Sequence, residues 1–365
     1  MFRDTQFRYT HLCLLAFSLT PAMLVADTFV QTNLVSDVSG LAATTDPNLK
    51  NPWGFSYSAT SPFWVSNQGS GNSTLYDGAG NPAALVVTVP GGGPPSGPTG
   101  QVFNGGTGFV LPNNTPAHFI FDTLNGTIAG WNAGTTAVTM VTTPGAVYTG
   151  LAIANNGAIP YIYAADTTGH IRVFDAGYNP VTLAGNFTDP NAIAGFTPFN
   201  VQTIGNSLYV EYAMTPGGHA LAGGYVDVFN TDGTFVKRLA TGGPLFAPWG
   251  VTLAPSTFGS FGNDLLVGNF GNGEINAFDP NSGAFLGTLD GSNGQPLVND
   301  NLWALGFRTG GANDNPNALY FTAGINGEAD GLFGAITPSP EPTTLALLGL
   351  GVACIGLARR KKRLK

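Results

Sequence analysis

Residues 163–175 read Tyr-Ala-Ala-Asp-Thr-Thr-Gly-His-Ile-Arg-Val-Phe-Asp, and this stretch decides the fold class. An apolar run ends at Asp166, a turn containing Gly169 follows, and a second run ends in an aromatic residue and Asp175. Two short runs separated by a glycine-containing turn predict a β-hairpin.

The same pattern recurs along the chain, at residues 63–77, 119–132, 208–230 and 265–279. In the copy at 208–230 the turn is expanded by four glycines, Gly217, Gly218, Gly223 and Gly224. A second marker, such as Pro52-Trp53-Gly54, lies upstream of each copy and also before a sixth. These markers start at Pro52, Pro98, Thr149, Pro198, Pro248 and Asn301. Their spacing of about 50 residues predicts six repeats that fill residues 51–336.

Each repeat is rich in short alternating runs broken by Gly, Asn, Asp and Pro, and no stretch of the body has a sustained helical period. Several short strands in each of six repeats predict an all-β, six-bladed β-propeller, in which radial packing leaves only short sheet edges. A further strand is expected over Thr28 to Val35. It either closes the ring by pairing with the last blade or remains a free edge, and closure is preferred because free edges invite aggregation.

The repeats resemble those of NHL-type six-bladed propellers, whose units run Pro-x-Gly, a strand ending in Asp or Asn, a short turn, and a strand ending in Phe-Asp. Residues 163–175 match best, whereas the Pro-x-Gly start is clear only at Pro52, Pro98 and Pro248. The resemblance implies the fold. It implies little about activity, because such propellers carry out unrelated functions.

The N-terminus has the pattern of a secretory signal peptide over residues 1–26. Arg3 and Arg8 precede an apolar stretch from Leu12 to Val25, and Ala26 suits the cleavage position. This pattern predicts export through the Sec translocon and a mature chain that starts near residue 27.

The C-terminus combines three elements in order. Pro340-Glu341-Pro342 is followed by an apolar run from Thr343 to Ala358, which as a helix would span about 24 Å. A basic cluster then follows, which the positive-inside rule keeps in the cytoplasm. It comprises Arg359, Arg360, Lys361, Lys362 and Arg363.

Residues 338–365 resemble the PEP-CTERM sorting signal of Gram-negative bacteria. The resemblance implies an exosortase as partner, a transient inner-membrane anchor over residues 343–358, and cleavage near the motif. It further implies release to the cell surface or the extracellular medium, in systems that accompany exopolysaccharide or biofilm matrix. The propeller domain is therefore expected over residues 27–337.

Removing both ends changes the chemistry of the chain. Residues 27–337 hold five Lys or Arg and 19 Asp or Glu, a net charge of about −14. Phosphate binding needs clustered cations, so nucleic acid is not an expected partner. Cys13 and Cys354 both lie in the removed ends, so the mature chain would have no thiol for a disulfide, a nucleophile or a metal.

Three tryptophans occupy equivalent positions near the starts of repeats: Trp53, Trp249 and Trp303. This position is expected to open the innermost strand of a blade, near the central channel. Two interpretations are open. The rings either stack on the flat face of a ligand such as a sugar or pack between blades, and packing is the default for large aromatic side chains.

The sequence offers no catalytic constellation. His118, His170 and His219 lie in different repeats without metal-ligand spacing, and no nucleophile elbow is present. Asn67, Asp122, Asp166 and Asn269 recur at strand ends, where they either ring one rim as calcium ligands or bond the backbone of their own turns. Repetition favours the turns, and the same interpretation applies to a later set of strand-end residues, Asp77, Asp175, Asn230 and Asp279. Weak calcium candidates are Asp166, Glu211, Asp300 and Asp314, the last two from Asn-Asp-Asn runs.

Two functions follow from these observations. The favoured one is a non-enzymatic, exported propeller without a required cofactor, which binds a polysaccharide or protein of the matrix or envelope. The alternative is a secreted calcium-dependent hydrolase or lactonase with its site in the propeller channel. It requires oxygen ligands from several blades to converge on the axis.

Overall fold

The computed structural model describes residues 28–91, 93, 96–215 and 219–339. The expected signal peptide lies outside this part of the chain. So do Pro340-Glu341-Pro342, the apolar segment 343–358 and the basic cluster. Among the described residues, no helix is long and apolar enough to cross a membrane.

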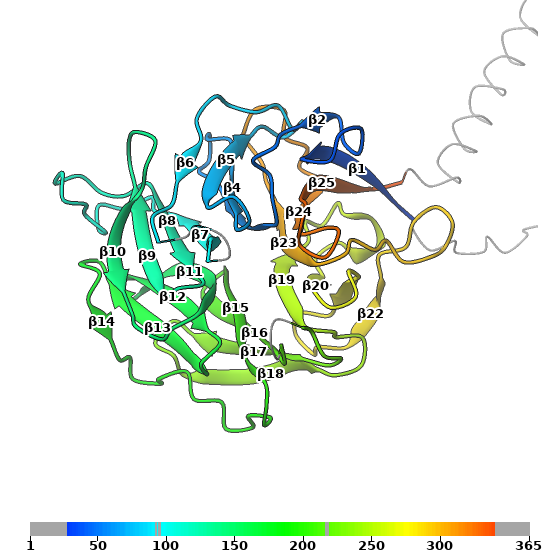
Figure 1. The fold of residues 1–365 in the computed structure, drawn as a ribbon. Coiled ribbons are helices and arrows are strands. Elements are labelled where there is room, and N and C mark those ends of the chain that lie inside the picture. Colours follow the sequence, from blue (N-terminus) through cyan, green and yellow to red (C-terminus); the bar gives the residue numbers. More distant parts are fainter. Residues whose placement is uncertain (1–27, 92, 94–95, 216–218, 340–365) are drawn as a thin grey trace, which may run out of the picture.

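Six antiparallel sheets are arranged around a central axis, so the chain is an all-β, six-bladed propeller as predicted (Figure 1). Blade 1 is β3 (Pro52–Ser56), β4 (Phe63–Asn67), β5 (Asn72–Tyr76) and β6 (Val87–Thr88). Blade 2 is β7 (Pro98–Phe103), β8 (Phe119–Thr123), β9 (Thr127–Trp131) and β10 (Val138–Thr142). Blade 3 is β11 (Tyr148–Asn156), β12 (Ile159–Asp166), β13 (His170–Asp175) and β14 (Pro180–Val181).

The second half of the chain repeats this arrangement. Blade 4 is β15 (Thr197–Ile204), β16 (Ser207–Ala213), β17 (Tyr225–Asn230) and β18 (Phe235–Thr241). Blade 5 is β19 (Pro248–Leu253), β20 (Leu265–Asn269), β21 (Ile275–Phe278) and β22 (Phe285–Thr288). Blade 6 joins β23 (Leu302–Phe307), β24 (Leu319–Ala323) and β25 (Leu332–Pro338) to two strands from the N-terminus, β1 (Phe29–Ser36) and β2 (Thr44–Thr45).

Burial follows the position of a strand within its blade. The second strands β4, β8, β20 and β24 are buried along their whole length, because neighbouring blades cover both of their faces. The outermost strands β10 and β22 are largely exposed. The first strands of successive blades contact one another around the axis. The core is therefore a ring of apolar layers between blades.

The stretch 163–175 forms the predicted hairpin, with Asp166 paired with His170 across its turn. The Asp166 carboxylate accepts hydrogen bonds from the backbone N–H of Thr168 at 3.0 Å and of Val147 at 3.1 Å. In the later turns of blades 1, 3 and 5, Asp77, Asp175 and Asp279 accept backbone N–H groups of their own turns. The turn interpretation of these acids is confirmed at those positions.

The expectation is wrong for Asn67, Asp122 and Asn269. The Asn67 amide donates to the side chains of Asn72 and Thr74, and the Asp122 carboxylate accepts hydrogen bonds from the Thr99 hydroxyl and the Gly100 N–H on β7. Asn269 bonds a different segment. Its side-chain oxygen accepts the Phe246 N–H at 3.1 Å, and its amide donates to the Pro244 carbonyl at 2.8 Å. The residue therefore ties β20 to the loop that leads into β19 of the same blade. Sequence spacing alone does not distinguish a side chain that closes its own turn from one that bonds an adjacent loop.

The N-terminal strand closes the ring, as preferred from the sequence. β1 pairs antiparallel with β25 from Phe29–Pro338 to Ser36–Leu332. The Ser339 N–H donates to the Thr28 carbonyl at 2.7 Å. Residues from the two ends of the chain thus build one sheet (Figure 1).

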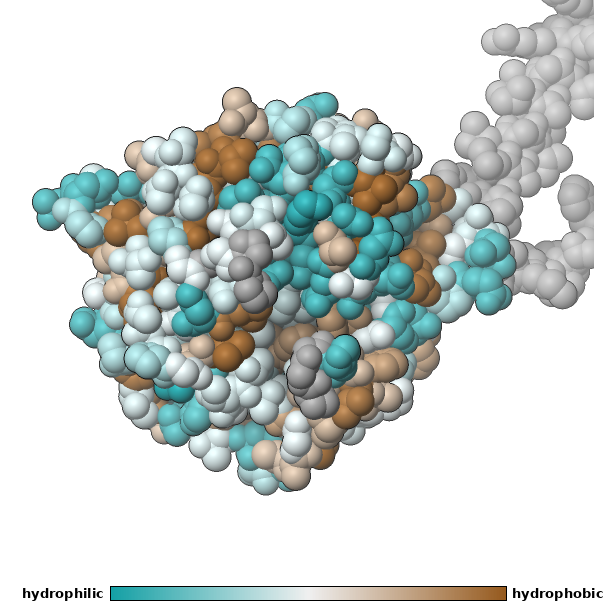
Figure 2. Space-filling model, in the orientation of Figure 1, coloured by the Kyte–Doolittle hydropathy of each residue, from teal (hydrophilic) through white to brown (hydrophobic). Residues whose placement is uncertain are grey.

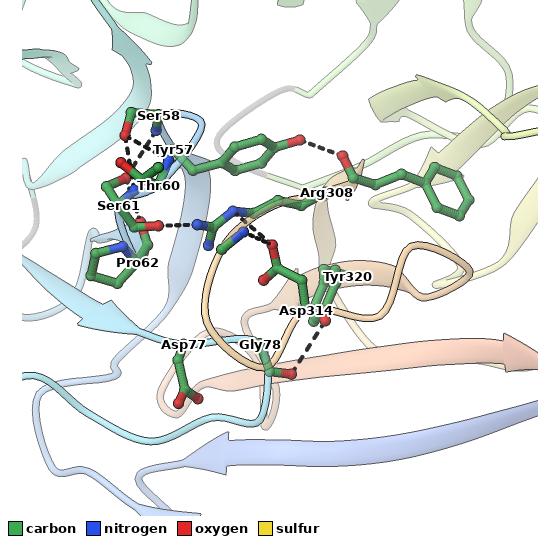
Figure 3. A network of polar contacts seen from close by, with 12 residues as sticks. Tyr57, Ser58, Thr60, Ser61, Pro62, Asp77, Gly78, Arg308, Asp314 and Tyr320 are labelled. Atoms are coloured by element: carbon green, nitrogen blue, oxygen red, sulfur yellow. Dashed lines mark hydrogen bonds and ion pairs between the residues drawn. The ribbon is translucent and has the colours of Figure 1, made fainter.

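A buried polar network joins the loop between β23 and β24 of blade 6 to blade 1 (Figure 3). The Arg308 guanidinium donates to the Ser61 carbonyl and forms an ion pair with Asp314. It also lies 4.7 Å from the ring centroid of Phe63. Tyr320 donates to the Gly78 carbonyl at 3.3 Å. The loop between β23 and β24 is therefore held against blade 1 by side chains as well as by packing.

Candidate functional site

The central channel has a narrow neck where the first strands approach one another. Pro52, Pro98 and Pro248 pair directly with residues of the second strand, and a register irregularity follows in each pair. The residues that form the neck follow shortly after the first residue of each first strand, and most of them are glycines. They are Gly54, Gly100, Gly150, Asn200, Gly250 and Ala304. A Cβ at Gly54 would lie 2.7 Å from the Thr99 carbonyl oxygen of the next blade, so the approach requires glycine.

A cavity of about 640 Å³ opens at the end of the channel where the first strands begin. All six blades or the loops between them contribute to it. Figure 2 shows a hollow near the centre of the ring, with hydrophilic residues gathered on the side of β23 to β25. The lining comprises Asn51, Trp53, Gln68, Leu124, Val147, Thr149, Thr167, Gly195, Thr197, Phe199, Met214, Thr215, Phe270, Trp303 and Glu328. We call this the mouth cavity.

Aromatic rings form the floor of the mouth cavity. Trp53 and Trp303 stack with ring centroids 3.5 Å apart, and Phe270 lies 4.4 Å from Trp303. Phe199 completes the floor at 5.8 Å from Trp303. The Trp303 indole N–H donates to the Asn51 side-chain oxygen at 3.1 Å, which fixes the orientation of the ring.

The structure brings the three predicted tryptophans together in one apolar cluster. Trp249 meets Trp53 and Trp303 edge to face, at 6.3 and 5.5 Å between centroids. Its indole N–H donates to the Thr149 carbonyl at 2.9 Å. Trp249 lines a smaller cavity of about 270 Å³ on the other side of the neck, whereas Trp53 and Trp303 line the mouth cavity. Each of the three tryptophans is at least nine-tenths buried, which agrees with packing between blades. Stacking of a ligand on these rings stays a prediction.

A polar group occupies one side of the mouth cavity. The Asn51 amide donates to Gln68 Oε1 at 2.9 Å and lies 3.4 Å from Glu328 Oε1. Burial raises the pKa of Glu328 above its ordinary value, and the hydrogen bond from Asn51 partly opposes this rise. Among the described lining residues, Glu328 carries the single ionisable side chain.

Two of the four metal candidates are engaged in ion pairs. Asp166 Oδ2 lies 2.6 Å from Arg172 Nε, and Asp314 Oδ2 lies 3.2 Å from Arg308 Nε. Burial alone would raise the pKa of Asp166, but hydrogen bonds from Thr168 and Arg172 lower it below the ordinary value. In each case the arginine balances the charge of the carboxylate, so the position of the carboxylate is explained without a metal ion.

The other two candidates lie in contrasting environments. Glu211 on β16 is fully buried, and no described residue hydrogen-bonds to either of its carboxyl oxygens. Burial raises the pKa of Glu211 well above its usual range. Asp300 is exposed in the loop before β23. Within the described residues, no group of three or more His, Cys, Asp or Glu side chains is placed to hold a metal ion. Calcium binding stays a prediction.

Sequence reasoning missed most of the mouth cavity. The sequence predictions do not include Asn51, Gln68, Phe270 or Glu328 among the channel residues, although all four line the cavity. The repeat pattern could have identified part of the lining, because the residue directly after the second strand lines the cavity in five blades. These residues are Gln68, Leu124, Thr167, Met214 and Phe270.

Comparison with known proteins places the chain in a family. "Uncharacterized protein R648" of Acanthamoeba polyphaga mimivirus is 34% identical over 325 residues, which cover 83% of this chain and 78% of that protein. The chain belongs to the family of this mimivirus protein. A second member of the mimivirus family, "Uncharacterized protein L690", is 31% identical over 325 residues, 83% of this chain and 84% of its own. These names state no activity for the mimivirus family.

Residues 340–363 match the family model of the PEP-CTERM protein-sorting motif, so the predicted sorting motif is confirmed. The motif implies export with a membrane-anchored sorting signal. Among solved structures, the crystal structure of Chaetomium thermophilum Raptor has a TM-score of 0.50 at 11% identity, covering 87% of this chain and 30% of that chain. The streptogramin B lyase structure has a TM-score of 0.46 at 12% identity, covering 86% and 98%. The likeness to Raptor concerns the fold alone.

Proposed function

We propose that this member of the mimivirus family is an exported β-propeller that binds a component of the extracellular matrix or envelope, and that the component is a saccharide. The mouth cavity carries the proposal. Its volume of about 640 Å³ lies in the range typical of small-molecule sites, and it combines an aromatic floor with amide and hydroxyl side chains.

The lining suits a sugar for two reasons. The apolar face of a sugar ring can pack against the parts of the floor residues Trp53, Phe199 and Phe270 that line the cavity. Its hydroxyl groups can exchange hydrogen bonds with Thr167, Thr197 and the other polar lining residues, which act as both donors and acceptors. A protein ligand would have to insert a single side chain or terminus into a cavity of this size.

The charge distribution is consistent with a ligand that is not anionic. Each Lys and Arg of the described chain is already engaged. Lys50, Arg172, Arg238 and Arg308 form ion pairs, and Lys237 donates to the carbonyls of Pro280 and Asn281. No cation among the described residues lines the mouth cavity. Neutral and cationic ligands therefore fit better than phosphates or uronic acids.

The proposed route follows from the two ends of the chain. The signal peptide of residues 1–26 directs the chain to the Sec translocon, and residues 343–358 hold it in the inner membrane until an exosortase cleaves near Pro340-Glu341-Pro342. The mature propeller of residues 27–337 is then released to the cell surface or the medium. Processing by an exosortase-type protease is implied by the motif, and the later steps are our proposal.

The channel offers little support for a calcium-dependent hydrolase. Such an enzyme needs about six oxygen ligands around one ion. At the described neck only Asn200 has a side-chain oxygen, and its amide nitrogen donates to the Trp249 carbonyl at 2.6 Å. Glu211 and Asn200 are register partners on β16 and β15, but no group of three or more His, Cys, Asp or Glu side chains is placed to hold a metal ion among the described residues.

A glycan array tests the proposal with the full chain purified in detergent. We expect signal on a defined set of saccharides and a loss of that signal in Thr167→Val, which removes a hydroxyl group from the lining. Thr168→Val is the matched control, because Thr168 is exposed in the same turn and outside the lining. Absence of signal on all saccharides, or equal signal for both variants and the native chain, would overturn the proposal.

A further inference from the structure

A single carboxylate in an otherwise uncharged, aromatic cavity restricts the chemistry of its ligand. Glu328 is the one ionisable side chain among the described lining residues, and it contacts Asn51, whose amide also donates to Gln68. Asn51 Nδ2, at 3.4 Å, is the hydrogen-bond donor that the described structure places on this carboxylate. The remaining lone pairs of Glu328 can therefore accept hydrogen bonds from a ligand.

Glu328 is held in place by an unusual backbone. Asn326, Gly327 and Glu328 have φ values of 55°, 66° and 69°, so three successive residues adopt the left-handed conformation. This conformation is unfavourable for a residue with a Cβ, and glutamate is not among the residues that favour it. Backbone strain of this kind persists only where the surrounding structure fixes it, and it clusters at functional sites.

The surrounding contacts supply that restraint. The Glu328 N–H donates to the Gly324 carbonyl at 2.9 Å, and the Asn326 amide donates to Asp330 Oδ2 at 2.9 Å. Asp330 lies 3.5 Å from Lys50 Nζ, and Lys50 immediately precedes Asn51. The turn of blade 6 that carries Glu328 and the segment of blade 1 that carries Asn51 are thus tied to each other, which presets the position of the carboxylate.

From this geometry we infer that Glu328 determines specificity in the mouth cavity, and that the saccharide carries a free amino group. An ammonium group beside Glu328 gains a charge-assisted hydrogen bond. An N-acetylated or neutral sugar of the same size lacks this charge-assisted hydrogen bond. This inference rests on the proposed saccharide function and adds the ligand class.

The test compares each amino sugar of a glycan array in its free-amine and N-acetylated forms, using the full chain in detergent. We expect the free-amine members to give the stronger signal. For the best pair, calorimetric titration should show about tenfold weaker binding of the free amine to Glu328→Gln, because a charge-assisted hydrogen bond is lost. Binding of the N-acetylated partner should change less than about twofold on the same scale.

Two further variants complete the design. Glu274→Gln is the matched control, since it makes the same change at a partly buried glutamate that does not line the cavity. Glu328→Asn removes the charge with a residue that tolerates the left-handed backbone, so loss of binding in a well-folded variant can be separated from loss of the turn.

The outcomes distinguish the two proposals. If no saccharide of either kind binds the native chain, the saccharide function fails and the amino-sugar inference fails with it. If saccharides bind but free amines are not preferred, or if both Glu328 variants keep native affinity for them, only the amino-sugar inference is overturned.

Discussion

Arg308 and Asp314 form a buried ion pair, with Nε and Oδ2 3.2 Å apart and with 0% and 4% of their side chains exposed. The pair orients Arg308 toward blade 1, where its guanidinium contacts the Ser61 carbonyl and lies over the Tyr57 ring (Figure 3). The same guanidinium lies 4.7 Å from the ring centroid of Phe63. A six-bladed ring must be fastened where its first and last blades meet. This chain does so with strand β1, which pairs into blade 6, and with Arg308, which is oriented by Asp314 and donates to the Ser61 carbonyl of blade 1.

Removing one partner of the pair should destabilise the fold strongly. We expect Arg308→Met to lower the free energy of unfolding by about 3–5 kcal/mol, because Asp314 is left buried without its cation. The double variant Arg308→Met/Asp314→Leu should recover most of that loss. Urea unfolding followed by tryptophan fluorescence measures both. Lys237→Met, which breaks no ion pair, serves as the control, and a double variant no more stable than Arg308→Met would contradict the interpretation.

Stability should decrease as the pH rises from about 5 towards 7.5. Burial raises the pKa of Asp122 to about 7, against hydrogen bonds from Thr99 and Gly100, and it also raises the pKa of Glu211. Each carboxyl binds its proton more tightly in the folded state. The contribution of each carboxyl to the free energy of unfolding is therefore complete below the pKa that the carboxyl has in the unfolded chain. It is lost as the pH rises through the higher pKa of the folded state, by at most about 1.4 kcal/mol per pH unit.

Calorimetric melting curves between pH 5 and 8 check this prediction. Asp122→Asn should flatten the pH dependence, because an amide does not titrate. Asp279→Asn should leave it unchanged, since the pKa of Asp279 is lowered by hydrogen bonds from Ser282 and its titration falls below this range. A native melting temperature that is constant or rises across the range would show that the buried carboxyls do not control stability.

The neck of the channel should not tolerate a methyl group. Gly54→Ala places a Cβ 2.7 Å from the Thr99 carbonyl oxygen, a backbone atom that cannot rotate away. We expect a loss of about 1–3 kcal/mol in the free energy of unfolding, as for other overpacked sites. Gly106→Ala, whose Cβ would lie 3.4 Å or more from its neighbours, should cost much less. Equal chemical denaturation midpoints for the two variants would argue against close packing at the neck.

Both ends of the chain should be absent from the exported protein. The predicted cleavages remove residues 1–26 and a tail that starts near Pro340, so intact mass spectrometry of the culture supernatant should give the mass of the propeller alone. In a strain without the exosortase, the tail should remain and the protein should stay with the membrane fraction. Full-length protein in the supernatant of both strains would refute the sorting proposal.

Local sequence was sufficient to predict the strands and the blade count. The predicted runs at 63–67 and 265–269 coincide with β4 and β20, and the markers at Pro52, Pro98 and Pro248 begin β3, β7 and β19. These features depend on side-chain alternation and turn residues, which act over a few positions. The hydrogen-bond partners of Asn269 could not be predicted, because the loop it bonds lies about 25 residues away and is placed by the folding of the blade.

The sequence by itself determined the architecture and the export signal: six repeats require six blades, and residues 340–363 match a sorting motif whose order of elements is linear. Only the tertiary structure decided which residues meet. Trp53 and Trp303 lie 250 positions apart yet stack, and Asn51 meets Glu328 across 277 positions, because closing the ring brings the first blade beside the last. A repeat pattern specifies each blade, whereas the cavity arises from six blades converging on one axis.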